Sequence, residues 1–426
     1  MPSVDTLIVF GASSKYLSWL EEDKSRRLIQ ICEKKISHPR VKTYILETPI
    51  EIPLFAREIA WRTVFQKIEI VSLEKSPFFE SFEKELKRCR IGADLLLSEA
   101  ADFGKTALRN AKKNQSGAFR DWRGLEGKFS KAPAFVIGAG PSLKKHVDLL
   151  AKFQDRGLIL AGGTALSALK CPPHFAAAID PKTTPKNPFS QVPLCTRARA
   201  HPETLSIEGE KILFPDPALP ILNWLYGVEG EFEAGWTVGN FLTRLAIHLG
   251  CNPIVFIGMD SCYIDGQKYG HLEHTAQEEL IEVVDAKGRK LNTQRDWLGA
   301  IQWTEETARE KEDLLFINTS EEGVCFQKPV QEASLLQVIE EHAKIDLQLK
   351  TRVEKVIQEL PFTSSSKKSI ADEDLEEKLL DPLWSVWRHI FEREAEIDSA
   401  PIPFDEKMKL HKSLFFSQIK SELADV

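Results

Sequence analysis

The sequence has no excess of positive charge. Its 426 residues include 56 Lys and Arg against 63 Asp and Glu, which gives a formal net charge of −7. A protein that binds nucleic acid usually presents a basic surface to the phosphates, so we expect no nucleic acid partner. This balance leaves room for a local basic pocket that holds one phosphate.

Long apolar runs and paired cysteines are also lacking. No apolar stretch approaches the roughly 18 residues of a membrane-spanning helix. The opening segment, MPSVDTLIVFGASS, has no basic residues before its apolar run, which is too short for a secretion signal. The seven cysteines are scattered and include no Cys-x-x-Cys pair. We therefore expect a soluble, cytoplasmic protein with reduced thiols and no membrane span.

Two common nucleotide motifs are missing. No Gly-Lys-Ser/Thr sequence of a phosphate-binding P-loop is present. The third glycine of a dinucleotide fingerprint would fall at Leu143, and residues 160–163 read Leu-Ala-Gly-Gly where an acidic residue is expected. The sequence thus disfavours nicotinamide chemistry and P-loop hydrolysis, and we expect no tightly bound cofactor.

What is present is an ordinary globular composition, with 42% hydrophobic and 28% charged residues. The length predicts two or three domains. Alternating strand and helix patterns predict a smaller α/β domain over 1–114 and a second α/β domain with a parallel sheet over 115–330. A helical region follows over 331–426, and its helices are a candidate surface for a protein partner.

Short apolar runs predict the strands, and longer patterned segments predict the helices. In the first domain we expect strands over 4–10, 41–46 and 68–73, a helix near 56–65, a polar helix reaching about Lys35, and a long helix over 78–113. In the central domain we expect strands over 134–137, 158–161, 175–179 and 254–257. Each of these ends in small or acidic residues, and ligands of parallel sheets bind beyond the carboxyl ends of the strands.

The most informative motif is Gly138-Ala139-Gly140-Pro141-Ser142-Leu143, which follows a predicted strand. Glycines allow close approach to the main chain, and Pro141 suits the first turn of a helix. Open amides at such a turn attract an anion, which predicts a phosphate site. The alternative is a plain strand-to-helix turn.

Acidic residues end two further predicted strands. Asp180 and Asp260 could hold a divalent ion such as Mg²⁺ or act as acid and base, or they could simply cap loops. His271 and His274, three residues apart, are a weak zinc signal without a third ligand. His271 is instead a candidate substrate-facing residue or a surface residue.

Taken in order, several motifs resemble one known family. They are Gly138-Ala139-Gly140-Pro141-Ser142-Leu143, Gly162-Gly163-Thr164-Ala165, Asp180, Gly235-Trp236-Thr237-Val238, Ile257-Gly258-Met259-Asp260, Asn292-Thr293 and Ile317-Asn318-Thr319. This set resembles the domain shared by the MptE-like 6-hydroxymethylpterin diphosphokinases and the motility-associated factor glycosyltransferases, over roughly residues 115–330.

The resemblance implies a Rossmann-like domain distantly similar to bacterial sialyltransferases. It implies that Gly138, Gly140, Pro141, Ser142 and Leu143 meet a nucleotide phosphate. It places Gly162, Gly163 and Thr164 near the nucleoside and matches Thr237 to the position after the family's paired glycines. Asp180 and Asp260 match acidic pocket residues, which would be Mg²⁺ ligands in the diphosphokinase branch.

Three functions follow as hypotheses. The first is a glycosyltransferase that moves a nonulosonate-type sugar from a CMP-sugar to a protein hydroxyl, with His271 or Asp260 as the base. The second transfers diphosphate from ATP to a small-molecule pterin acceptor, with Mg²⁺ bound by Asp180 and Asp260. The third is a catalytically inactive nucleotide-binding or interaction protein, suggested by Ala139 and Trp236, which depart from the family pattern.

Overall fold

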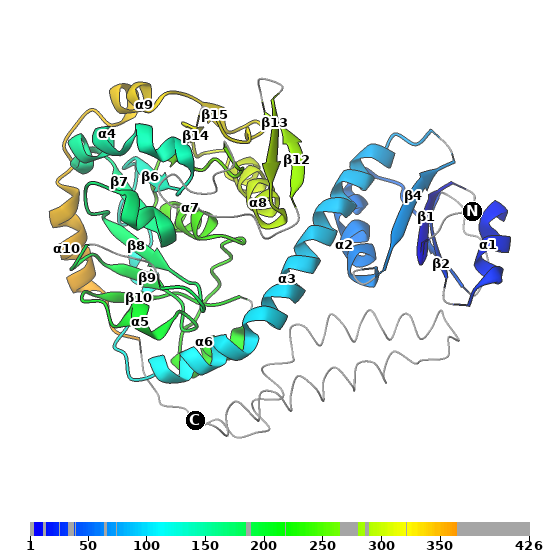
Figure 1. The fold of residues 1–426 in the computed structure, drawn as a ribbon, viewed down its shortest axis with the longest axis horizontal. Helices are drawn as coiled ribbons and strands as arrows, with labels where there is room; N and C mark the ends of the chain where they lie inside the picture. The colour runs from blue at the N-terminus through cyan, green and yellow to red at the C-terminus, as the bar shows by residue number, and fades with distance from the viewer. Residues whose placement is uncertain are drawn as a thin grey trace. The chain divides into compact units, whose positions relative to one another are not determined.

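The computed structural model describes residues 4–363 except for 12–13, 25, 33–37, 39, 64–65, 74, 185–188, 218, 265–279, 286–288 and 321. The chain divides into two compact units, of which the first includes Met1–Ala101 and the second is Asp102–Ser369. The division falls within a long helix, α3 (Phe79–Asn114) (Figure 1). The three parts predicted from the sequence, with boundaries after residues 114 and 330, stay a prediction.

The first unit holds a four-stranded parallel sheet in the order β3-β2-β1-β4. The expected strands and the expected helix near 56–65 are confirmed with slightly shifted ends. The elements are β1 (Thr6–Phe10), η1 (Ser14–Tyr16), α1 (Leu17–Glu22), β2 (Arg27–Ile31), β3 (Val41–Tyr44), η2 (Pro49–Glu51), α2 (Ile52–Arg62) and β4 (Ile68–Ser72), followed by α3.

One expectation for this unit is wrong. The polar helix expected to reach about Lys35 ends at Glu22, and Arg27–Ile31 forms strand β2. This strand lies between β1 and β3, so it has packing partners on both of its faces. Leu28 packs towards α1 on one face, and Ile29 packs towards α2 and α3 on the other. Burial on both faces therefore outweighs the polar character of the flanking residues.

The second unit is built on a nine-stranded parallel sheet in the order β15-β14-β11-β6-β7-β8-β9-β10-β5. The predicted Rossmann-like α/β class is confirmed. The strands are β5 (Arg120–Asp121), β6 (Ala134–Ile137), β7 (Leu158–Gly162), β8 (Phe175–Ala178), β9 (Leu194–Thr196), β10 (Lys211–Leu213), β11 (Ile254–Ile257), β14 (Phe316–Asn318) and β15 (Gln331–Glu332).

The helices of this unit vary in length, and a separate antiparallel hairpin pairs β12 (Ile281–Val284) with β13 (Lys290–Thr293). The α-helices are α4 (Val147–Lys152), α5 (Pro202–Leu205), α6 (Pro220–Tyr226), α7 (Val238–His248), α8 (Arg295–Glu310), α9 (Leu335–His342) and α10 (Leu349–Glu359). The short 3-10 helices are η3 (Trp122–Leu125), η4 (Pro141–Lys145), η5 (Gln154–Arg156) and η6 (Gly163–Ala168).

Helices cover both faces of the large sheet (Figure 1). On one face, Leu150 of α4 and Val338 of α9 pack on Ile137 and Ile257. On the other, α7 packs along β6, β7 and β8. The strand order reverses at β6, since the chain runs from β6 outwards to β10 and then returns to β11 on the opposite side. Such a reversal point is where open α/β sheets place their ligands.

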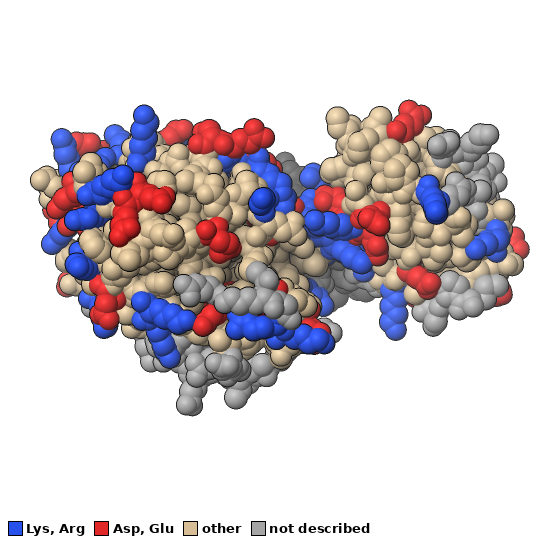
Figure 2. Space-filling model, turned by 90° about the horizontal axis from the view of Figure 1, so that it is seen from above, with Lys and Arg blue, Asp and Glu red and all other residues tan. Residues whose placement is uncertain are grey.

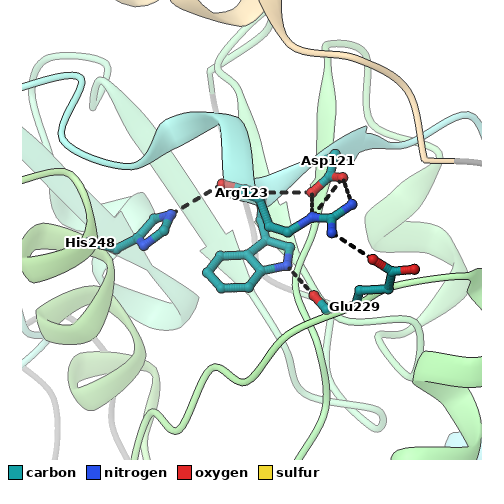
Figure 3. A network of polar contacts seen from close by, with 5 residues as sticks. Asp121, Arg123, Glu229 and His248 are labelled. Carbon is teal, nitrogen blue, oxygen red and sulfur yellow. Dashed lines mark hydrogen bonds and ion pairs between the residues drawn. The ribbon is translucent and has the colours of Figure 1, made fainter.

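A polar network fixes the turn that follows β5 (Figure 3). The guanidinium of Arg123 donates to Asp121 Oδ2 at 2.7 Å and to Glu229 Oε2 at 2.7 Å. The indole of Trp122 donates to the Glu229 carbonyl, and His248 Nε2 lies 3.3 Å from the Trp122 carbonyl oxygen. The network therefore ties the edge of the sheet to the end of α7.

Acidic and basic side chains are interspersed on the face of the molecule shown in Figure 2. Within the described residues, no helix is both long enough and apolar enough to cross a bilayer. Of the expected C-terminal helical region, α9 and α10 are described, and its part beyond residue 363 lies outside the described residues.

Candidate functional site

A cleft of about 560 Å³ opens beyond the carboxyl ends of β6, β7, β8 and β11. This is the edge of the sheet at which the strand order reverses, as expected for a ligand site in such a fold. Its volume falls in the range of small-molecule pockets, roughly 300–1,000 Å³. Eight residues singled out in the sequence line it: Gly138, Gly140, Gly162, Gly163, Thr164, Asp180, Thr237 and Asp260.

The loop after β6 is more closed than its sequence indicated. Ser142 and Leu143 are each only 2% exposed, and Leu143 belongs to the hydrophobic core. Neither these two residues nor Pro141 lines the cleft. Ser142 and Leu143 are therefore not accessible to a phosphate in this arrangement, and the contact predicted for Pro141 stays a prediction.

The main-chain amides of this loop already donate within the protein. The Gly138 and Gly140 amides donate to the carbonyls of Ile257 and Gly258, at 2.8 and 2.9 Å. The Ser142 amide donates to Asp260 Oδ2 at 2.8 Å. The prediction that these amides are open to an anion is wrong for this structure, because an internal carboxylate and two carbonyls accept from them.

Gly138 and Gly140 allow the backbone of the loop after β6 to pack closely against the loop after β11. A Cβ atom added to Gly138 would lie 2.3 Å from the Gly258 carbonyl oxygen. A Cβ atom on Gly140 would lie 2.4 Å from Asp260 Oδ2. Because real Cβ atoms do not approach so closely, glycine is required where the loops after β6 and β11 meet.

Asp260 is the residue that joins these loops. Its side chain is buried at 1% exposure, and its second oxygen, Oδ1, accepts a short hydrogen bond from the Ser142 hydroxyl. Burial raises the pKa of Asp260, and the hydrogen bonds from Ser142 partly oppose that rise. The carboxyl group of Asp260 is therefore the acceptor for both the amide and the hydroxyl of Ser142.

Asp180 holds a different loop, the one after β8. Its Oδ1 accepts from the amides of Lys182 and Thr183 at 2.7 and 3.1 Å. Asn110 of α3 supports the same loop, since its Nδ2 donates to the Pro181 carbonyl at 2.7 Å. Asp180 is half-buried at the cleft, so it is more accessible than Asp260.

These contacts do not fit a metal ion between the two acids. Both oxygens of Asp260 accept from Ser142, and Asp180 Oδ1 is taken up by its own turn. In the described part of the chain, no three His, Cys, Asp or Glu side chains are grouped so that they could hold a metal. The predicted Mg²⁺ role of Asp180 and Asp260 gains no support from this geometry.

Thr237 and Gly163 are two of the four remaining predicted residues that line the cleft, together with Gly162 and Thr164. The Thr237 hydroxyl caps α7, accepting from the Asn240 amide at 3.1 Å. Gly163 has φ +53°, and a Cβ atom added there would meet no atom within 4 Å. The backbone at Gly163 thus has free space beside it in the cleft.

Two outcomes remain for the sequence-based site. His271 lies outside the described residues. Several polar or aromatic residues that line the cleft were missed by sequence reasoning: Ser167, Thr183, Thr184, Ser261, Cys262 and Trp297. The two threonines lie three and four residues after Asp180 and could have been found from its position after a strand, whereas no sequence signal marks Trp297.

Comparisons with known proteins agree with this fold. Residues 105–266 match the family described as 6-hydroxymethylpterin diphosphokinase MptE-like. The family resemblance predicted from the sequence is therefore confirmed for this part of the chain, which contains β5 to β11.

The chain is also similar to a solved structure, that of the MAf glycosyltransferase from Magnetospirillum magneticum AMB-1. The TM-score is 0.60 at 15% sequence identity, and the match covers 99% of this chain and 77% of that one. At this identity the likeness shows a shared fold. No protein with a curated description matches the chain.

Proposed function

We propose that the chain is a transferase that takes a sugar from a nucleotide-activated donor bound in the cleft. One observation carries the proposal: the cleft of about 560 Å³ lies at the strand-order reversal of a domain with the MptE-like family match and the fold of a glycosyltransferase. Its polar lining includes the hydroxyls of Thr164, Thr183 and Thr184, which suit the hydroxyl and phosphate groups of such a donor.

The donor's position follows from where space remains. Asp260 and neighbouring carbonyls accept from the amides of the loop after β6. We therefore propose that the phosphate lies beside Gly163, where the backbone can be approached closely. A CMP-sugar of the nonulosonate type is the proposed donor, and a protein hydroxyl is the proposed acceptor.

The acceptor hydroxyl needs a base. Of the two described acids, Asp180 is the better candidate, because it is half-buried at the cleft whereas Asp260 is buried and bonded to Ser142. The described cysteines are all free, in keeping with the cytoplasmic location that we also propose.

The test is a calorimetric titration of CMP and CMP-sugars into the full chain and two alanine variants. Gly163→Ala and Gly127→Ala both place a methyl group at a positive φ, +53° and +66°, so their backbone strain is similar. Only Gly163 lines the cleft. We expect Gly163→Ala to weaken CMP binding about tenfold or more and Gly127→Ala to leave it unchanged.

Other results would contradict this proposal. Equal CMP affinity in the two variants would show that the donor does not bind beside Gly163. A wild-type chain with no affinity for CMP, CDP, UDP, GDP or ATP would favour an interaction protein that keeps the fold without the chemistry.

A second function is favoured by the description of the matched family. We propose as the alternative that the chain transfers diphosphate from ATP to 6-hydroxymethylpterin. Release of AMP that depends on the pterin and is lost in Asp180→Ala would support it. The same release rate in Asp180→Ala would exclude the role of this carboxylate in that reaction.

A further inference from the structure

The wall of the cleft after β8 carries a hydroxyl that is tied to two side chains behind it. Thr184 lines the cleft, and its Oγ1 lies 2.9 Å from His201 Nδ1 and 3.3 Å from Glu203 Oε2. His201 precedes α5 and Glu203 belongs to it, so both side chains come from the segment after β9. Neither of them lines the cleft. Of these three side chains, a ligand in the cleft can therefore touch Thr184.

Main-chain contacts hold the two segments together. The His201 amide donates to the Asp180 carbonyl at 3.1 Å, which joins the loop after β9 to the loop after β8. Asn110 of α3 is 5% exposed, and its Nδ2 donates to one carbonyl in each loop, at 2.7 and 3.1 Å. The contact between Thr184 and His201 is thus supported by the backbone on both sides.

The hydroxyl hydrogen of Thr184 is used within this group. A threonine hydroxyl has one hydrogen to donate and two lone pairs that accept. When His201 Nδ1 carries a hydrogen, it donates to Thr184 Oγ1, and the hydroxyl donates to Glu203. In the other tautomer the hydroxyl donates to Nδ1. In both cases at least one lone pair of Thr184 Oγ1 remains for a ligand, so Thr184 faces the cleft as an acceptor.

Two other polar side chains of the cleft are acceptors as well. Asp180 Oδ1 accepts from two amides of its own turn, and an ionised carboxylate has no hydrogen to donate. The Thr237 hydroxyl donates to Asn240 Oδ1 at 3.1 Å. Asp180, Thr184 and Thr237 therefore offer a ligand acceptors, which suit its hydroxyl groups and not its phosphate oxygens.

We propose that Thr184 Oγ1 accepts a hydrogen bond from a hydroxyl of a ribose or sugar ring, with His201 and Glu203 as positioning residues behind it. This role rests on the proposed function, in which the ligand is a nucleotide-activated sugar. Neighbouring strands lie roughly 5 Å apart, and β7 pairs with β8. A ring attached to a phosphate beside Gly163 can therefore reach the loop after β8. Thr184 then selects ligands that carry a hydroxyl at this point.

The experiment measures by calorimetry how the full chain and its variants bind three ligands. These are CMP, dideoxy-CMP, which lacks both ribose hydroxyls, and CMP-N-acetylneuraminic acid, which adds the hydroxyls of a nonulosonate. Thr184→Val removes the threonine hydroxyl at nearly constant shape, and Thr184→Ser keeps it. Thr351→Val is the matched control, because Thr351 is exposed on α10 and does not line the cleft.

The two sources of the hydroxyl give different results. For a ribose hydroxyl, we expect Thr184→Val to weaken CMP binding about fivefold, the effect of one neutral hydrogen bond, and to leave dideoxy-CMP binding unchanged. For a hydroxyl of the transferred sugar, the loss should appear with CMP-N-acetylneuraminic acid and not with CMP. Thr184→Ser and Thr351→Val should bind like wild type. His201→Ala should weaken the same ligand and add little to Thr184→Val, because it acts through that hydroxyl.

Several results would overturn this role of Thr184. Equal affinities of Thr184→Val and Thr351→Val for CMP and for the CMP-sugar would show that Thr184 touches neither ligand. An equal loss for CMP and dideoxy-CMP would show that Thr184 donates to a phosphate or a base. A wild-type chain that binds none of the three ligands would overturn both this role and the proposed function. CMP binding that depends on Gly163 and not on Thr184 would overturn this role alone.

Discussion

The contact between Ser142 and Asp260 gives the sharpest prediction about the candidate site. Asp260 accepts from both the amide and the hydroxyl of Ser142 in an environment that is almost fully buried. Hydrogen bonds to a charged group contribute about 1.5–3 kcal/mol each. Ser142→Ala removes one of them, so we expect the second unit to lose about 1.5–3 kcal/mol of unfolding free energy.

Asp260→Ala should lower the unfolding free energy by more, about 3–5 kcal/mol, because it removes both hydrogen bonds between Ser142 and Asp260. The Ser142 amide and hydroxyl then lose Asp260 as their acceptor. Part of that loss is offset, since burial makes the ionised carboxylate costly and raises its pKa. The double variant should lose little more than Asp260→Ala alone. The coupling energy between the two sites is then about 1.5–3 kcal/mol.

Urea unfolding followed by tryptophan fluorescence gives the four free energies of this cycle. Hydrogen exchange of the peptide that contains Ser142 supplies a local readout, because its amide should lose protection in Asp260→Ala. Ser142→Ala should retain that protection, since its amide still donates to Asp260. A coupling below about 0.5 kcal/mol, or unchanged exchange in Asp260→Ala, would refute the view that this carboxylate closes the loop.

Two further predictions concern stability. Gly138→Ala should lower the unfolding free energy of the second unit by about 1–3 kcal/mol or more, because its methyl group would lie 2.3 Å from the Gly258 carbonyl oxygen. In the control Gly127→Ala, the nearest neighbour of the methyl group is Ser130 Oγ at 3.7 Å, so the loss should be only about 1 kcal/mol. Equal urea midpoints for the two variants would contradict this prediction. His174 is buried and accepts from the Ile159 amide at 2.9 Å, and burial lowers its pKa to about 4. Because the pKa of His174 is lower in the folded than in the unfolded state, the contribution of neutral His174 to the unfolding free energy is complete above about pH 6.5. It is lost as pH falls towards 4, by about 3 kcal/mol in all. His174→Asn should show a shallower fall in urea midpoint over that range, and an identical fall would exclude the effect.

Local sequence pattern was sufficient for the main elements of the fold. The runs at 134–137, 158–161, 175–179 and 254–257 became β6, β7, β8 and β11, because each is apolar and buried on both faces of a parallel sheet. Strands β9 and β10 were not predicted, because a strand of three residues is too short to show a hydrophobic period. Their place in the sheet depends on pairing with β8 and with each other.

The candidate site could be located from the sequence but its contacts could not. Position after a strand identified Gly138, Gly163, Asp180 and Asp260, and all four line one cleft. A glycine in the sequence does not show what lies next to it. At Gly138 the neighbour is the backbone of Gly258, whereas the space beside Gly163 is open. Which of the two applies depends on the order of strands, and the order is a property of the whole sheet.

The strand order also limits how a donor can bind. Because β6 lies between β7 and β11, the loop after β6 has two neighbours, and the one after β11 delivers Asp260 to the Ser142 amide. A phosphate that took this place would have to expel a buried carboxylate and replace both of its hydrogen bonds. Each of these bonds contributes about 1.5–3 kcal/mol of stability. Binding beside Gly163, on the loop after β7, displaces no such contact. For the donor that we propose, the lower-cost position is therefore on the β7 side of the cleft, and Asp260 holds the neighbouring wall in place.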